Sequence, residues 1–84
     1  METQIGQITH YYSRIGVAVL VLTGELTIGE TIHILGHTTD INQQVTSMEI
    51  EHNQVQSVGP GMDVALKVTV PVRSGDFVYK VVEG

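Results

Sequence analysis

Apolar residues in this chain never follow the i, i+3, i+4, i+7 spacing of a helix for more than one turn. They form short runs in which apolar and polar residues alternate, as in half-buried strands. Turns that contain glycine separate these runs, and the clearest is Gly59-Pro60-Gly61. The pattern predicts six or seven short strands and no helix, and therefore an all-β domain. We expect a closed barrel, because it leaves no free sheet edge, and a sandwich is the alternative.

The stretch from Leu22 to Leu35 organises the rest of the chain. Gly24 and Gly29 mark two backbone corners within it, because glycine adopts a positive φ at little cost. Leu26 and Ile28 alternate with polar residues between these corners, as in an extended segment that points two apolar side chains inward. We expect a positive φ at Gly29.

Length and composition favour one folded domain over residues 1–84. The chain is 42% hydrophobic and 15% charged, which is typical of neither a disordered protein nor a coiled coil. It has no cysteine, which excludes disulfides and zinc-thiolate sites and fits a reducing compartment. The N-terminus does not resemble a signal peptide, and the longest apolar run, Val17 to Leu22, is too short to span a bilayer. We expect a cytoplasmic protein without membrane contact.

The net charge is −5, from four basic and nine acidic residues. Binding to bulk nucleic acid relies on Lys and Arg side chains that neutralise phosphates, so this balance argues against it. A single pocket for one nucleotide end is compatible with the charge.

No motif predicts catalysis, a cofactor or a metal. His33 and His37 are four residues apart, but they fall on a strand that runs into a loop, where this spacing does not bring two rings to one ion. We expect both to face solvent. Glu49 and Glu51 share a predicted strand face, and a solvated face is favoured over a catalytic acid pair. No nucleophile elbow or phosphate-binding loop is present, so the residues predict a non-enzymatic β module.

The segment Val17 to Leu22 is apolar at every position, unlike the other strands. A strand that is apolar on both faces is covered on both. One face belongs to the core. Either a partner covers the other face, or Tyr11, Tyr12 or the C-terminal residues cover it, and the sequence leaves the two alternatives open.

Four segments resemble, in order and spacing, the second domain of translational GTPases of the elongation factor Tu family. They are LTGELTIGETIHILG, VTSMEIEHNQV, VGPGMDVALKV and VRSGDFVYKV, and the match covers roughly residues 14 to 82. The matching residues are Gly24, Gly29, Glu30, Thr46, Glu49, Pro60, Gly61, Val64, Gly75 and Asp76. The resemblance implies a single six-stranded closed Greek-key β-barrel of the translation-protein type.

The resemblance also implies a binding face. The family holds the aminoacyl end of tRNA with a Phe-Arg pair that follows a strand glutamate. Here Glu49 is kept, whereas Glu51 and His52 occupy the positions of the pair. We expect a binding face at Glu49, Glu51 and His52, and the lost aromatic ring and the acidic charge favour protein over an RNA end. There is no GTPase domain, so no nucleotide hydrolysis is implied.

A second surface follows from Leu20 and Leu22, which occupy positions where the family has charged residues on the outer face. The resemblance therefore places Val17, Val19 and Val21 inside, and predicts a contact surface at Leu20 and Leu22 for a second copy or a partner. The first functional hypothesis is a translation-associated binding module. The alternative is a structural or oligomerisation barrel, or an accessory module acting in trans for an enzyme such as a collagenase-like peptidase.

Overall fold

The computed structural model describes residues 1–82, and within them it contains strands and turns but no helix. The prediction of an all-β fold is confirmed. Accordingly, no helix in the described residues is long and apolar enough to cross a membrane. The strands are β1 (Glu2–Tyr12), β2 (Val17–Leu22), β3 (Leu26–Thr27), β4 (Thr31–Leu35), β5 (Asp40–Gln44), β6 (Met48–Ile50), β7 (Asn53–Gln54), β8 (Ser57–Val58), β9 (Asp63–Lys67) and β10 (Phe77–Val81).

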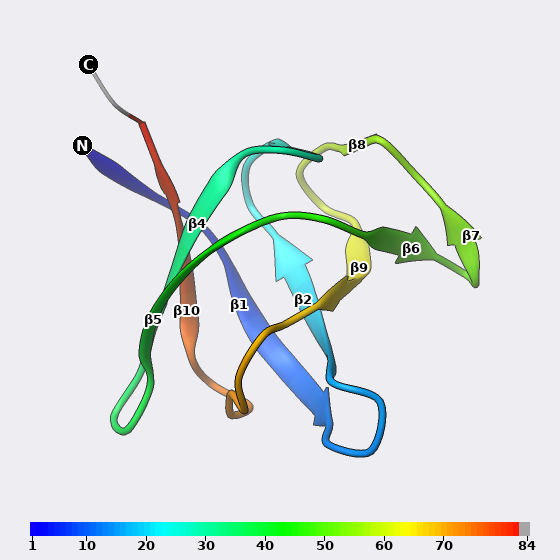
Figure 1. Cartoon of the computed structure of the whole chain (residues 1–84). Coiled ribbons are helices and arrows are strands. Elements are labelled where there is room, and N and C mark those ends of the chain that lie inside the picture. Colours follow the sequence, from blue (N-terminus) through cyan, green and yellow to red (C-terminus); the bar gives the residue numbers. More distant parts are fainter. Residues whose placement is uncertain (83–84) are drawn as a thin grey trace.

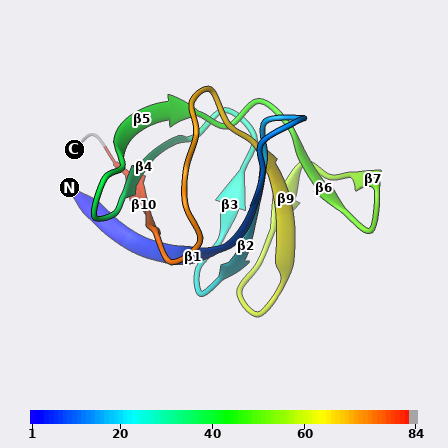
Figure 2. The same ribbon diagram turned by 90° about the horizontal axis from the view of Figure 1, so that it is seen from below.

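Eight strands form one antiparallel sheet in the order β5-β4-β10-β1-β2-β9-β6-β7, and β3 pairs with β8 in a small second sheet. The main sheet curls around the core (Figures 1 and 2). The first part of β1 pairs with β10 and the rest pairs with β2, so this strand joins the two halves of the sheet. A glycine is needed where β1 bends, because a Cβ at Gly6 would lie 2.7 Å from the carbonyl oxygen of Val21.

The described strands do not form the predicted six-stranded closed barrel. The sheet has two ends, β5 and β7, which do not pair with each other. A glutamine side chain bridges part of the gap. Gln43 of β5 donates from Nε2 to the carbonyl oxygen of Lys67 at 2.9 Å, and its Oε1 accepts from the amide of Thr69 at 3.0 Å. A side-chain amide thus takes the place of a backbone ladder between β5 and the segment that follows β9.

The positive φ expected at Gly29 is confirmed, with a value of 94°. Gly29 is the third residue of a turn in which the amide of Glu30 donates to the carbonyl oxygen of Thr27 at 3.1 Å. The Glu30 carboxylate accepts from the Thr27 amide at 2.7 Å and closes the same turn from the other side. The corner that sequence places before β4 is therefore a glycine-dependent turn.

The core consists of buried apolar side chains from both halves of the sheet. They are Ile5, Ile8, Ala18, Leu20, Leu22, Leu26, Ile32, Ile34, Val45, Met48, Val58, Val64, Leu66, Val68, Val72 and Val78. In β2, β4 and β9 every second residue is buried, as expected for strands that pack one face on the core.

The predicted contact surface at Leu20 and Leu22 is wrong, because these side chains are 0% and 1% exposed and lie in the core. Residues that pair directly across antiparallel strands share a face. Leu20 pairs with Val64, whereas Val17 pairs with Lys67. A lysine does not enter the core, so the register turns the valines of β2 outward and the leucines inward.

The chain bends between β5 and β6. Strand β5 ends at Gln44, and β6 begins at Met48. Val45 and Met48 are both buried, and they are three residues apart rather than an even number. The bend between them starts β6 on a new alternation, in which Met48 faces the core.

Candidate functional site

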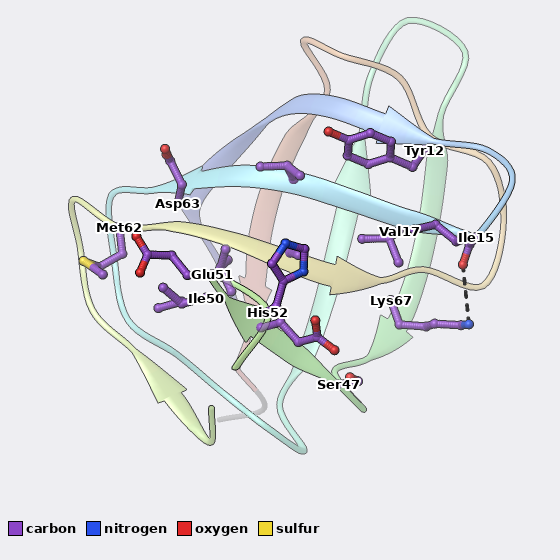
Figure 3. A pocket seen from close by; sticks show the side chains of 14 residues that line it. Tyr12, Ile15, Val17, Ser47, Ile50, Glu51, His52, Met62, Asp63 and Lys67 are labelled. Atoms are coloured by element: carbon purple, nitrogen blue, oxygen red, sulfur yellow. Dashed lines mark hydrogen bonds between the residues drawn. The ribbon is translucent and has the colours of Figure 1, made fainter. Parts of the chain in front are cut away.

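A groove of about 960 Å³ lies on the outer face of β2, β9 and β6 (Figure 3). Its floor is made of Val17 and Val19 of β2 and Ala65 of β9, all of them half-buried. Val19 pairs directly with Ala65, so the smallest side chain lies in the middle of the floor. The outer face of the uniformly apolar strand is therefore the floor of an open groove.

One wall of the groove is the hairpin formed by β6 and β7. Ile50 pairs with Asn53, which leaves Glu51 and His52 as a two-residue turn. Both turn residues have positive φ, 50° and 68°, and they are the only non-glycine residues among 1–82 that do. Two-residue hairpins of this kind prefer Asn-Gly, and a side chain in this conformation costs of order 1 kcal/mol. The strained turn presents Glu51 and His52 to the groove.

The opposite wall comes from the turn between β1 and β2. Tyr12 and Ile15 line the groove there, and they are 49% and 59% exposed. The Lys67 ammonium group donates to the carbonyl oxygen of Ile15 at 3.5 Å, and this contact ties the end of β9 to the turn (Figure 3). The groove thus has an exposed aromatic and aliphatic rim on one side and a polar hairpin on the other.

The charges around the groove are mostly negative. Glu49, Glu51 and Asp63 contribute carboxylates, whereas Lys67 is the one Lys or Arg among its described lining residues. Three carboxylates near an apolar floor favour a cationic, partly apolar ligand and disfavour phosphate. These groups do not form a catalytic relay, because among residues 1–82 no hydrogen bond links Ser47 to His52 or His52 to a carboxylate.

The structure brings the three predicted binding-face residues together. Glu49, Glu51 and His52 all line the groove. Whether they bind a ligand stays a prediction. Sequence reasoning named Tyr12 as a residue near this face but missed other lining residues, such as Ile15, Asp63 and Ala65. Their signal was the uniformly apolar strand Val17–Leu22, whose outer face they surround, but that signal required the correct choice of face.

His33 lies elsewhere, on the outer face of β4 between the buried Ile32 and Ile34, but two carboxylates cover it, so it is less exposed than expected. Its side chain is 15% exposed, and its two ring nitrogens contact carboxylates, Nδ1 with Glu2 Oε1 at 2.7 Å and Nε2 with Asp40 Oδ1 at 2.5 Å. The hydrogen bond with Glu2, and next the one with Asp40, raise the pKa of His33 above its ordinary value, and burial opposes them. His37 is exposed on the β4–β5 loop. Within residues 1–82 no three His, Cys, Asp or Glu side chains are grouped to hold a metal ion.

No family model matches the chain. The chain is 38% identical over 79 residues to an uncharacterized protease of Methanocaldococcus jannaschii, and the match covers 93% of this chain and 19% of the relative. It is 36% identical over 81 residues to a collagenase of Porphyromonas gingivalis, covering 94% of this chain and 22% of the relative. The chain therefore spans about a fifth of the length of the curated relatives that it matches.

A solved structure, the C-terminal domain of a putative U32 peptidase from Geobacillus thermoleovorans, has the same fold. The TM-score is 0.87 at 19% identity, over 92% of this chain and 90% of that domain. Its selenomethionine variant gives 0.86 at 18% identity. These matches overturn the assignment to the second domain of elongation factor Tu and the translation-factor role drawn from it. The sequence is similar to a segment of proteases and collagenases instead.

Proposed function

We propose that this domain is a non-enzymatic accessory module that binds a polypeptide and acts in trans for a collagenase-like peptidase. The named relatives are a protease and collagenases, and this chain corresponds to about a fifth of each. Such a segment is too small a share of those proteins to carry their activity over, so a supporting role is the proposal that the matches favour.

The observation that carries the proposal is the groove on the outer face of β2. An apolar floor at Val17, Val19 and Ala65 with carboxylates around it is suited to binding, since apolar contact gives affinity and the polar rim gives orientation. A nucleophile would need a base within hydrogen-bond reach, and no such contact involves Ser47 among the described residues. Binding without catalysis is therefore the function that this geometry supports best.

Self-association through Leu20 and Leu22, the basis of the oligomerisation hypothesis, has no support once both side chains lie in the core. The carboxylates around the groove also favour a protein partner over an RNA end. Location in the cytoplasm stays a prediction, which cell fractionation checks.

The proposal is tested with the purified chain and a purified collagenase-like peptidase from the same cells. We expect the chain alone to leave fluorogenic collagen-derived peptides intact. Added to the peptidase, it should bind in sedimentation velocity and raise kcat/KM for a long substrate more than for a short one. Hydrolysis by the chain alone, or an unchanged kcat/KM for both substrates at saturating chain, refutes the proposal.

A further inference from the structure

The outer face of the sheet at the groove is arranged in rows that cross β2, β9 and β6. Direct pairing defines the rows, because paired residues lie side by side on one face. Val17 pairs with Lys67 in the first row. In the second row Val19 pairs with Ala65, and Ala65 pairs with Glu49. Asp63, paired with Val21, lies in the third row.

The charges differ between the two ends of the groove. Lys67 stands at one end, where its ammonium group is held by the carbonyl oxygen of Ile15. Asp63 lies four residues away along the same strand, and Glu49 belongs to the row between them. Successive rows are about 6.6 Å apart, which is two residues of extended chain, so the two ends are about 13 Å apart. An extended polypeptide has side chains at the same interval.

The middle row of the floor has the smallest side chain and is apolar. Ala65 has only a methyl group, and Val19 beside it is apolar, so an entering aliphatic side chain meets apolar surface there. Glu49 stands in the same row as Ala65, Asp63 lies one row further along β9, and Glu51 lines the groove from the hairpin turn. In an extended ligand, a cationic side chain two residues from the aliphatic one can reach these carboxylates while the aliphatic side chain stays over Ala65.

We propose that the groove binds an extended polypeptide segment that places an aliphatic side chain over Ala65 and a Lys or Arg side chain against Glu49, Glu51 and Asp63. This inference rests on the polypeptide-binding part of the proposed function and adds the chemistry of the partner. The acidic rim excludes nucleic acid by charge, and the length of the groove matches a strand of about four residues rather than a compact ligand.

The test uses fluorescein-labelled heptapeptides and fluorescence polarisation with the purified chain. The first probe is Ser-Lys-Ala-Leu-Ala-Lys-Ser. A second replaces both lysines with glutamate, and a third replaces the leucine with serine. We expect the first probe to bind at least about tenfold more tightly than either of the others at low salt, since it alone has both the apolar and the cationic groups. Its affinity should fall as salt is added.

Substitutions in the groove test whether the probe binds there. Ala65→Phe fills the floor and should abolish binding of the first probe. The double substitution Glu49→Gln with Glu51→Gln should weaken it by about fivefold to tenfold, because two partly exposed charges are lost. Glu25→Gln is the matched control, since Glu25 is an exposed acid outside the groove lining. Circular dichroism checks that each variant keeps the wild-type fold.

The outcomes separate this inference from the function on which it rests. Equal affinity for the lysine and glutamate probes, or unchanged binding by folded Ala65→Phe, overturns the inference. If the chain still stimulates the peptidase in that case, the accessory function stands and the partner chemistry is wrong. If the lysine probe binds in the groove but the peptidase is neither bound nor stimulated, the inference stands and the accessory role fails.

Discussion

Replacing Gln43 should weaken the contact between β5 and the end of β9. This contact, in which the Gln43 side chain bonds to the backbone of Lys67 and Thr69, is called the seam below. This side chain is 8% exposed and connects two parts of the fold that share no strand ladder. It donates to the carbonyl oxygen of Lys67 at 2.9 Å and accepts from the amide of Thr69 at 3.0 Å. Gln43→Met keeps the unbranched shape and removes these two hydrogen bonds, together with two longer ones at 3.4 Å that join the side chain to the carbonyl oxygen of Gln44 and the hydroxyl of Thr69. The substitution therefore measures what the polar contacts of this side chain contribute to stability.

The expected loss of unfolding free energy is about 1–2 kcal/mol. The two shorter hydrogen bonds, at 2.9 and 3.0 Å, contribute roughly 0.5–1.5 kcal/mol each, and the two at 3.4 Å add little. The lower half of that range applies because Lys67 and Thr69 are exposed enough for water to replace the lost partner. For a domain of this size, a change of 1 kcal/mol lowers the melting temperature by about 4–8 °C. Gln43→Met should therefore melt clearly below the wild type.

Gln43→Glu tests which end of the Gln43 amide donates a hydrogen bond and which end accepts one. The carboxylate can still accept from the Thr69 amide, but it places a second acceptor against the carbonyl oxygen of Lys67. Protonation supplies a donor again, so the folded state raises the pKa of the new glutamate. Its stability should approach that of the wild type below the unfolded pKa of a glutamate and be lost as pH rises through the folded value.

Urea unfolding followed by circular dichroism measures each free energy, and Gln44→Met is the control because Gln44 is an exposed neighbour on the same strand. If Gln43→Met and Gln44→Met are equally stable, the side chain does not close the seam. A Gln43→Glu variant whose stability relative to the wild type is independent of pH would contradict the proposed geometry.

Three further predictions concern the fold. Gly29→Val should cost about 1–3 kcal/mol in urea unfolding, because φ is 94° and the strain is in the backbone, while no atom within 4 Å would crowd the new Cβ; an unchanged midpoint would show that the turn tolerates a side chain. Leu20→Ala should cost about 2–5 kcal/mol, since Leu20 is fully buried, and a folded Leu20→Arg protein by circular dichroism would refute the face assignment. NMR titration should give His33 a pKa above its ordinary value of 6.5. The stability that its carboxylate partners provide should then be present below about pH 6.5 and lost as pH rises through the folded value, so the difference in unfolding free energy between wild type and His33→Gln should shrink at alkaline pH.

Sequence patterns predicted the parts of the fold that depend on local chemistry. The glycine corner at Gly29 and the strand Val17–Leu22 follow from the conformational freedom of glycine and from apolar runs. The seam at Gln43 could not be predicted, because nothing local shows that one glutamine among several meets a distant backbone. The ion pairs of His33 were missed for the same reason, since Glu2 is 31 residues away in sequence.

The face of β2 is the clearest case in which pairing, not propensity, decides the outcome. Every residue from Val17 to Leu22 is apolar, so the strand itself contains no information about which side faces the core. The adjacent strand β9 does contain it, because Asp63 and Lys67 alternate with the apolar Val64 and Leu66. Once Val17 is paired with Lys67, the leucines must enter the core and the valines must face outward. The same pairing turns the surplus apolar surface into the groove floor beside Glu49, so the register that corrects the predicted contact surface also creates the candidate binding site.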